Sequence, residues 1–570
     1  MTTVTKLISM CNTFNSDTVC AVSKCGEEWK MSDIYIQSFK VAKSLTFLGL
    51  IPRYESASVF CWNSPEWIVS TLGTIFAGGR ACSIHFNSTK TRCEYILNDS
   101  NSRVIFVDTK ERLNIALETK NIKAIVIVGD RGDLVMNKPK HVYTWKQFIE
   151  LGSRIRDDIV MERINAQKVE DCAMLVYTSG TTGNPKGVML SHDNITWTAK
   201  AHMDHNPIFS SEAMRVLSFL PLSHIASIMF DMFVPFTCMT YYNKPATIYF
   251  TDSSDLSIDD LKRVKPTVIF AVPRTWEKLS EKVREIDSKM NGVLHRLFKN
   301  ICLRSHKSRQ NGKGAINSLV HTYMNFFIKR KIGLDKVQLC FTGAASPNLE
   351  VVEYFSSLGV DIVGAYGMSE LSGSQCYSKP DNFIDGYSGL PVPGTQVRVD
   401  KDTRELCFRG RQVMMGYYGY ADSSIDEDGW FHTGDIGEIH ESGHIKVTGR
   451  IDDLIVTAYG MNIMPTPIET YLKEKCEDIE NVVLVGDNQK CLGILVSISP
   501  GGNISNIHSC LKDYNSSAAL TRSDKIRHIY VIKEKFTIEG GELTPTGKIC
   551  RSNIIKKYEN EIKSMYLDFD

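Results

Sequence analysis

At 570 residues the chain is longer than one hydrophobic core usually supports, so at least two domains are expected. Its 66 lysines and arginines nearly balance its 65 aspartates and glutamates, and a net charge of +1 gives no basic footprint for nucleic acid. The 16 cysteines form no CxxC pair and no Cys/His spacing typical of zinc, which favours a reducing compartment and argues against disulfides.

The first part of the chain predicts an α/β fold. Residues 1–19 lack the apolar core of a secretory signal, so no cleavage is expected. Apolar residues recur at helical spacing over 34–50, and a strand and a second helix should follow, with Asn63 or Ser64 as the cap and Pro65 at the first helical position. Short Val/Ile-rich runs over 103–108 and 124–129 are typical of parallel strands separated by helices.

The stretch LVYTSGTTGNPKGVMLSHDN, residues 175–194, is typical of a loop that binds phosphate. Backbone amides can approach an anion closely at glycines, hydroxyls add donors, and Lys186 supplies positive charge. In a Walker A loop the lysine directly follows the last glycine, whereas here Pro185 precedes it, which disfavours a P-loop NTPase. A plain surface loop is the other alternative. The glycines and hydroxyls are Gly180, Gly183, Gly187, Thr178, Ser179, Thr181 and Thr182.

The motif YTSGTTGNPKG resembles the phosphate loop of the adenylate-forming superfamily, which includes acyl-CoA synthetases, luciferases and nonribosomal peptide adenylation domains. The resemblance implies that residues 178–183 bind nucleotide and that Lys186 acts in catalysis. It can be tested against the segments that follow along the chain.

The most apolar stretch, residues 216–239, is interrupted by Ser223, His224 and Asp231, whereas a membrane-spanning helix needs about 20 apolar residues. We expect it to form buried core and a wall of the substrate site. A lone histidine among apolar residues is more often a core residue than a functional one, but the resemblance places His224 at a carboxylate-binding wall.

The next segments are a strand that runs into a helix and a long basic helical region. VIFAVPRTWEKL, residues 268–279, resembles a border of the acyl pocket in long-chain acyl-CoA synthetases, and an ordinary strand and helix explain it equally well. Residues 282–336 are helical, basic and partly amphipathic. They favour a solvated face and leave peripheral contact with a membrane open.

Two small-residue turns follow predicted strands. In LCFTGAAS, residues 339–346, a flat ring could lie against a backbone that bulky side chains would obstruct. VDIVGAYGMSE, residues 360–370, is a buried strand with a similar end. By resemblance these are the adenine loop and the YGxTE motif, in which Tyr366 stacks on the base and Glu370 holds Mg²⁺ together with Thr178. The nucleotide-binding residues so implied are Gly343, Ala344, Ala345, Tyr366, Gly367, Met368 and Ser369.

GWFHTGD, residues 429–435, precedes a hairpin-like run that ends in TGRIDDLI. Asp435 resembles the acid that accepts both ribose hydroxyls of the nucleotide, and Arg450 can bind ribose or phosphate oxygens with its forked donors. Asp452 matches the position of the superfamily's hinge. Taken alone, TGD is a common turn.

The last 120 residues or so are of ordinary size for a small domain. A helix is expected over 469–475, and strands over 482–486 and 492–497. Lys548 follows TPTG in a loop, and the resemblance implies that it enters the active site during adenylation. By resemblance, Gly460 matches the face of the small C-terminal domain that meets CoA. Tyr459 and Met461 beside it depart from the family's pattern.

All five motifs stand in the superfamily's order, and the details are similar to the bubblegum type of long-chain acyl-CoA synthetase. The implied fold is a large N-terminal adenylation domain, residues 1–450, with mixed and parallel sheets flanked by helices and a β-barrel-like part. A small α+β lid, residues 451–570, would carry Lys548. The implied reaction activates a fatty acid with ATP and Mg²⁺ to an acyl adenylate and then transfers the acyl group to coenzyme A.

Several alternatives remain open at this point. A luciferase-like oxygenase or a medium-chain acid ligase would share every motif, and a degenerate protein could bind acyl chains or nucleotide without turnover. A nonribosomal adenylation domain would normally pass its product to a carrier domain, and no carrier segment follows here. We expect a cytoplasmic enzyme. The sequence does not determine its oligomeric state, its organelle or the length of its acyl substrate.

Overall fold

The structure is a computed structural model. It describes residues 2–129, 134, 139, 141–178, 184–206, 209, 213–289, 292–309, 328–343, 348–379, 382–421, 424–519, 524–544 and 548–567. Part of the predicted nucleotide site therefore lies outside the described residues: Ser179, Gly180, Thr181, Thr182, Gly183, Ala344 and Ala345.

The first large sheet has seven strands in the order β7-β6-β5-β3-β4-β8-β9. Every neighbouring pair is parallel except β8 and β9, which are antiparallel. The strands are β3 (Ser56–Phe60), β4 (Arg80–Ser83), β5 (Ser102–Val107), β6 (Ala124–Ile127), β7 (Val142–Thr144), β8 (Cys172–Thr178) and β9 (Lys186–Ser191).

Helices cover both faces of this sheet, as its buried strands require. One face packs against α2 (Met31–Phe47), α3 (Pro65–Phe76), α6 (Trp145–Leu151), η2 (Gly152–Arg154) and α7 (Asp157–Asn165). The other packs against α4 (Lys90–Asp99) and α5 (Lys110–Glu118). The predicted cap is confirmed at Ser64, whose side chain accepts from the Trp67 N–H, with Pro65 opening α3.

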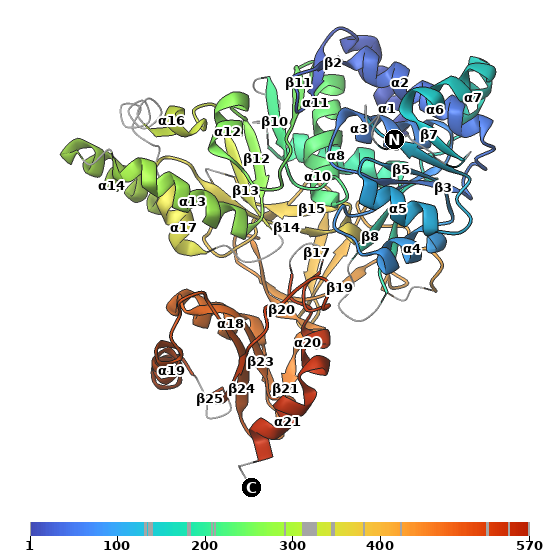
Figure 1. Ribbon diagram of the computed structural model, residues 1–570. Coiled ribbons are helices and arrows are strands. Elements are labelled where there is room, and N and C mark those ends of the chain that lie inside the picture. The colour runs from blue at the N-terminus through green and yellow to red at the C-terminus, as the bar shows by residue number, and fades with distance from the viewer. Residues whose placement is uncertain are drawn as a thin grey trace.

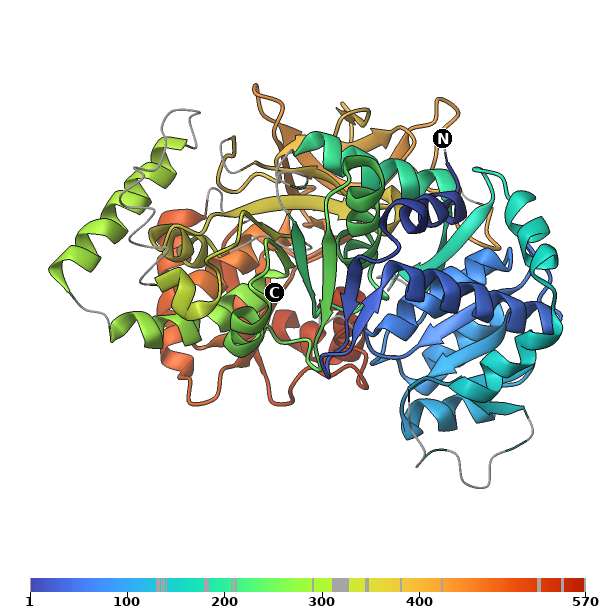
Figure 2. The same ribbon diagram turned by 90° about the horizontal axis from the view of Figure 1, so that it is seen from above.

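The second large sheet has nine strands in the order β16-β15-β14-β13-β12-β10-β11-β1-β2, and it is parallel from β14 to β1. Figure 2 shows it in green and yellow beside the blue seven-stranded sheet. Its strands are β1 (Val19–Val22), β2 (Glu28–Lys30), β10 (Met214–Ser218), β11 (Ala246–Phe250), β12 (Val268–Ala271), β13 (Leu339–Thr342), β14 (Ile362–Met368), β15 (Gly373–Tyr377) and β16 (Leu390–Pro391).

One continuous apolar core joins the two large sheets, and a second lies on the far face of the nine-stranded sheet. Between the sheets lie α1 (Val4–Asn15), α8 (His192–His205), α10 (Ile225–Ser227), η3 (Ile228–Phe233) and α11 (Val234–Tyr242). On the far side lie α12 (Ile258–Val264), α13 (Pro273–Ser288), α14 (Val293–Arg309), α16 (Arg330–Ile332) and α17 (Leu349–Ser357).

The apolar stretch 216–239 is mostly buried in the first core, with Leu217 and Phe219 in the second, as predicted for core. Of the helices that the structure describes, one is apolar and long enough to cross a membrane, Ile225–Tyr242, and 78% of that stretch is buried inside the protein. Such burial is what a core helix shows, so length and composition here are weak evidence for a span.

The barrel-like part is an antiparallel sheet of four strands, and η6 (Ile451–Asp453) follows it directly. Figure 1 shows this sheet above the C-terminal part of the chain, which contains α18 to α21. The strands are β17 (Gln396–Val399), β18 (Glu405–Arg409), β19 (Phe431–Ile439) and β20 (Ile445–Arg450). With η5 (Ser369–Leu371) they complete the larger body. The predicted α/β class, with sheets flanked by helices, is confirmed.

The C-terminal part has cores of its own, confined to residues 455–565. A hairpin of β21 (Ile455–Val456) and β22 (Asn462–Ile463) leads into a three-stranded sheet with helices around it. The remaining elements are α18 (Pro465–Lys475), β23 (Ile479–Val485), β24 (Leu492–Ile498), α19 (Ile504–Asp513), η7 (Tyr514–Ala518), β25 (Ile526–Ile532), α20 (Arg551–Lys557) and α21 (Glu559–Leu567).

An arginine at the start of α20 braces this part internally. Arg551 donates from Nη2 to both carboxylate oxygens of Glu469 on α18, each at 2.6 Å, and from Nη1 to the Leu484 carbonyl on β23 at 2.9 Å. Its Nε lies 3.5 Å from Oδ1 of Asp453 in η6. Helix, sheet and linker are thereby joined through one side chain.

Candidate active site

The hairpin of β8 and β9 carries Thr178 and Lys186 at its loop end, where the two residues are directly paired. This pairing fixes both ends of the phosphate loop. At the next position Tyr177 faces Gly187, and a Cβ on Gly187 would lie 2.9 Å from the tyrosine ring. We attributed Gly187 to close approach of an anion. The structure gives it a packing role, because the Tyr177 ring occupies the space and its hydroxyl donates to Asp99 at 2.6 Å.

Glu370 lies in η5, just after β14, and only 8% of it is exposed. Burial raises the pKa of the Glu370 carboxyl, while the hydroxyl of Tyr417, which donates to its Oε1 at 2.8 Å, acts in the opposite direction. The Nζ atom of Lys186 lies 4.9 Å from the centroid of the same tyrosine ring. Tyr417 thus contacts both predicted residues. The sequence argument missed it, although GYYGY at 416–420 is an unusual aromatic run.

Small residues are required where β13, β14 and β15 approach one another. A Cβ on Gly367 would lie 2.0 Å from the carbonyl oxygen of Gly373, and one on Gly343 would lie 3.0 Å from that of Ala365. The close strands place Tyr366 so that its hydroxyl donates to Oδ2 of Asp435 at 2.7 Å. Burial raises the pKa of Tyr366, and Asp435 acts in the same direction.

Asp435 and Arg450 face each other across β19 and β20, with Nη1 3.1 Å from Oδ1. The sequence predicts that GWFHTGD precedes the hairpin, but Asp435 lies within β19, the first strand of that hairpin. Burial raises the pKa of the Asp435 carboxyl, and Arg450, Tyr366 and Lys548 all oppose that rise. The site therefore combines one buried acid with two cations.

Lys548 comes from the C-terminal part and joins this group. Its backbone is bonded to Thr544, which donates its N–H to the Lys548 carbonyl at 2.8 Å and accepts from the Lys548 N–H through its hydroxyl at 3.0 Å. The side chain keeps access to solvent, yet the surrounding protein desolvates the ammonium and lowers its pKa. Asp435 raises the pKa of Lys548, and Arg450 lowers it.

The charge of Lys548 also acts on His224, which is neutral at neutral pH. Burial, followed by the charge of Lys548, lowers the pKa of His224 to about 4. The ring of His85 stands perpendicular to it, with centroids 6.1 Å apart, and burial lowers the pKa of His85 to about 3. The Nδ1 atom of His85 accepts the Asn87 N–H at 3.2 Å, so its proton is on Nε2. The sequence argument did not single out His85, which follows a buried strand.

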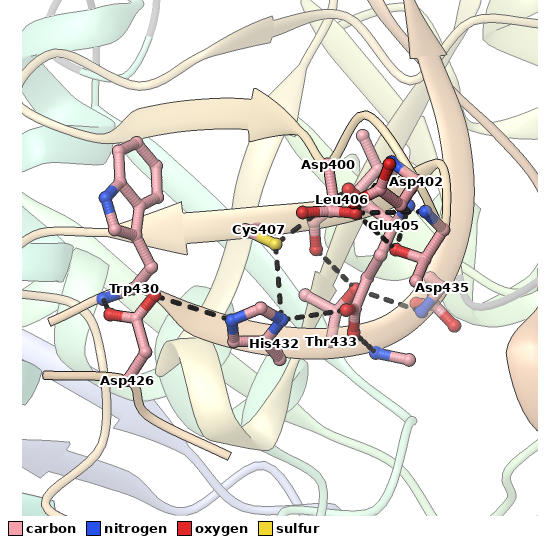
Figure 3. A network of polar contacts seen from close by, with 12 residues as sticks. Asp400, Asp402, Glu405, Leu406, Cys407, Asp426, Trp430, His432, Thr433 and Asp435 are labelled. Atoms are coloured by element: carbon pink, nitrogen blue, oxygen red, sulfur yellow. Dashed lines mark hydrogen bonds and ion pairs between the residues drawn. The ribbon is translucent and has the colours of Figure 1, made fainter. Parts of the chain in front are cut away.

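Figure 3 shows the network of polar contacts that supports residues 432–435, which we call the Asp435 segment. Glu405 accepts from the Gly434 N–H at 2.6 Å and pairs with Nδ1 of His432 at 2.8 Å. Thr433 accepts the Asp435 N–H through its hydroxyl at 3.0 Å. Glu405 thereby holds Gly434 and His432, which lie one and three positions before Asp435.

A carboxylate oxygen of Glu405, the thiol of Cys407 and a ring nitrogen of His432 lie within 4.8 Å of one another, a spacing that a metal ion could use. The hydrogen bond to Glu405 raises the pKa of His432, and burial raises the pKa of Cys407 to about 11. The thiol of Cys407 is therefore protonated at neutral pH, and the shift at His432 also favours its protonated form, whereas metal ligands must be deprotonated. We interpret the cluster as the support of the Asp435 segment.

Two predicted residues lie apart from this centre. Asp452 is in η6, directly after β20, where the chain passes into the C-terminal part. Gly460, with φ +73°, forms the turn between β21 and β22, and its N–H donates to the Thr457 carbonyl at 2.8 Å. Its neighbours Tyr459 and Met461 are 67% and 41% exposed. The described site thus joins Lys186, Glu370, Tyr366, Asp435, Arg450, Lys548 and His224, with Gly460 on an exposed hairpin.

Comparison with known proteins assigns the chain to a family. The family model described as AMP-binding enzyme matches residues 11–418, and the model of the AMP-binding enzyme C-terminal domain matches residues 452–570. The chain belongs to the AMP-binding enzyme family. This confirms the resemblance to the adenylate-forming superfamily.

Relatives of this AMP-binding enzyme agree with the bubblegum type. Long-chain-fatty-acid–CoA ligase ACSBG2 of Xenopus laevis is 33% identical over 97% of the chain and 82% of its own length. The ligase ACSBG2 of Rattus norvegicus is 33% identical over 95% of the chain and 90% of its own length. ACSBG1 of Macaca fascicularis is 33% identical over 95% of the chain and 82% of its own length.

Solved structures share the fold of this AMP-binding enzyme. O-succinylbenzoate coenzyme A synthetase from Bacillus subtilis, in complex with AMP, has a TM-score of 0.70 and 17% identity, and the match covers 96% of this chain and 97% of that one. The anthranilate CoA ligase AuaEII, in complex with anthranoyl-AMP, has a TM-score of 0.71 and 17% identity, with 98% of each chain covered. At this identity they establish the architecture alone.

Proposed function

We propose that this chain is a long-chain fatty acid–CoA ligase that works through an acyl adenylate. One observation carries the proposal: Lys548, from the C-terminal part, is close enough to Asp435 and Arg450 for their charges to shift its pKa. Its own charge shifts the pKa of His224. A lysine so placed can act on a nucleotide and on a carboxylate at once. The names of the relatives, which are long-chain-fatty-acid–CoA ligases, support the class of substrate.

In the first step a fatty carboxylate oxygen attacks the α-phosphorus of ATP, a new P–O bond forms, and the bond to the β-phosphate breaks to release pyrophosphate. Displacement at a polyanion chiefly requires positioning and charge neutralisation. Lys186 and Lys548 supply positive charge, and Asp435 with Arg450 binds the ribose. Neutral His224 and His85 line the carboxylate side without adding charge.

Glu370 and Thr178 are fit to hold Mg²⁺ on the phosphates. Both offer hard oxygen donors, and Glu370 is buried beside β9 with one oxygen held by Tyr417. When bound, the ion neutralises phosphate charge and orients the leaving pyrophosphate. The chain's own contribution is to fix that carboxylate and to place Lys186 near it.

In the second step the thiolate of coenzyme A attacks the acyl carbonyl, and AMP leaves. For this the C-terminal part, residues 451–570, would rotate about Asp452, withdraw Lys548 and present the hairpin of Gly460. Separate apolar cores on the two sides of this boundary support such a division. The sixteen free cysteines support a cytoplasmic location.

The test is a pyrophosphate-release assay with purified protein and acids from acetate to very long chains, each with and without coenzyme A. We expect release with long-chain acids and acyl-CoA formation only when coenzyme A is present. Light emission without use of coenzyme A would instead indicate a luciferase-like oxygenase. No release with any acid would indicate a degenerate binding protein and refute the proposal.

A further inference from the structure

A short segment, residues 414–418, connects the elements that carry Lys186 and Glu370, and we call it the tyrosine strap. On one side the Met414 N–H donates to the Glu370 carbonyl at 2.9 Å. On the other side the strap forms a short ladder with β9. Its bonds run from Tyr418 N–H to the Gly187 carbonyl at 2.8 Å, from Met415 N–H to the Met189 carbonyl at 3.0 Å, and from Met189 N–H to the Gly416 carbonyl at 3.1 Å.

The central side chain of the strap contacts both charges. The Tyr417 hydroxyl donates to Oε1 of Glu370 at 2.8 Å, and the face of its ring lies 4.9 Å from Nζ of Lys186. The second distance is within the range of a cation–π interaction. Tyr420 adds a more distant ring face, 5.9 Å from the same Nζ. One rigid side chain, held by backbone bonds on both sides, thus separates a buried anion from an exposed cation.

We propose that Tyr417 is a positioning residue that sets the separation between Lys186 and Glu370 for the polyphosphate of ATP. The inference rests on the ATP-dependent reaction proposed above. Lys186 is exposed and has a flexible stem, so without the ring its ammonium would sample many rotamers. Glu370 needs a donor on one oxygen to keep the other in a fixed direction. Charges that act on one polyphosphate are effective only when held in place.

The two contacts can be removed separately. Tyr417→Phe removes the hydroxyl that donates to Glu370 and keeps the ring face beside Lys186. Tyr417→Leu removes both, so Lys186 should be released as well. Tyr418→Phe is the matched control, because it also removes a hydroxyl from the strap. That hydroxyl accepts from Nη2 of Arg80 at 3.3 Å.

The experiment is calorimetric titration of the full-length protein with ATP, once with excess Mg²⁺ and once in EDTA, without fatty acid or coenzyme A. Tyr417→Phe should weaken ATP binding about tenfold in Mg²⁺ and leave it unchanged in EDTA, consistent with one hydrogen bond to a charged group. Tyr417→Leu should weaken binding in both. Tyr418→Phe should match the wild type in both titrations. In a separate steady-state assay, the KM for fatty acid should not change in any variant.

Equal losses for Tyr417→Phe in Mg²⁺ and in EDTA would overturn the inference, and so would a Tyr417→Leu protein that binds ATP like the wild type. Thermal unfolding without ligand checks the fold. If Tyr417→Phe folds poorly, Tyr417→Trp keeps a ring face without the hydroxyl and should show the same Mg²⁺-specific loss. A wild type that binds ATP but releases no pyrophosphate would refute the proposed function alone, whereas one that binds no ATP would refute both.

Discussion

The hydroxyl of Tyr366 donates to the carboxylate of Asp435 at 2.7 Å, while Arg450 lies 3.1 Å from the other carboxylate oxygen. The acid is therefore oriented from two sides before any nucleotide binds. Its orientation depends on β14 from the nine-stranded sheet and β20 from the four-stranded sheet. The acid is thus positioned where two sheets meet.

Asp435→Ala should raise the KM for ATP more than the KM for fatty acid, because the carboxylate is expected to accept the ribose hydroxyls. Tyr366→Phe should act in the same direction and more weakly, since Arg450 still holds the acid. Steady-state kinetics with each substrate varied in turn measures both effects. An ATP dependence that Asp435→Ala leaves unchanged would remove this residue from the nucleotide site.

Lys548→Ala should reduce adenylation by on the order of 10² to 10³, the usual loss for one preorganised donor. Transfer from a supplied acyl adenylate to coenzyme A should survive, since the lysine is withdrawn in that step. The two half-reactions are measured as pyrophosphate release and as acyl-CoA formation. Equal losses in both would contradict the division of labour between them.

The KM for ATP should rise with pH through the support of the Asp435 segment. Glu405 raises the pKa of His432, and Asp426 acts in the same direction. The ion pair of His432 with Glu405 is therefore complete below about pH 6.5, the ordinary pKa of histidine, and is lost as the pH rises through the raised pKa. Above that pH, Glu405 accepts the Gly434 N–H without a protonated His432 beside it. His432→Gln keeps the polar shape and should remove this part of the pH dependence. A pH profile of the KM for ATP that is the same in both proteins would show that the pair has no such role.

Gly367→Ala should destabilise the protein by about 1–3 kcal/mol or more, the usual cost of overpacking. The added methyl group would lie 2.0 Å from the Gly373 carbonyl oxygen, and backbone cannot move aside as a flexible side chain can. Gly292→Ala is the control, because a Cβ there meets no atom within 4 Å. Urea unfolding of the two variants compares them. Equal midpoints would show that β14 and β15 can separate without cost.

The sequence predicted the parts of the site that depend on local motifs. Asp435, Arg450 and Lys548 come from three separate segments, and the structure brings their charges together as the resemblance implied. Ser64 and Pro65 begin α3 as expected from capping rules. These features were predictable because each depends on neighbouring residues or on a motif of defined order.

The parts that depend on contacts between distant segments could not be predicted. Tyr417 meets Glu370 across 47 positions of the chain, and no periodicity reports such a contact. The packing role of Gly187 could not be predicted for a similar reason, since the ring that excludes a side chain there comes from the neighbouring strand. The start of α18 at Pro465, four residues before the predicted 469, reflects the tolerance of a helix for proline in its first turn.

The bonds of Arg551 have a consequence for the proposed rotation of the C-terminal part, residues 451–570. This residue stands three positions after Lys548 and is tied to Glu469, Leu484 and Asp453, the last of them next to the expected pivot at Asp452. These bonds join α18, β23, η6 and α20 into one unit. Under the proposed rotation, Lys548 and the Gly460 hairpin would therefore move together, and withdrawal of the lysine would be coupled to presentation of the hairpin.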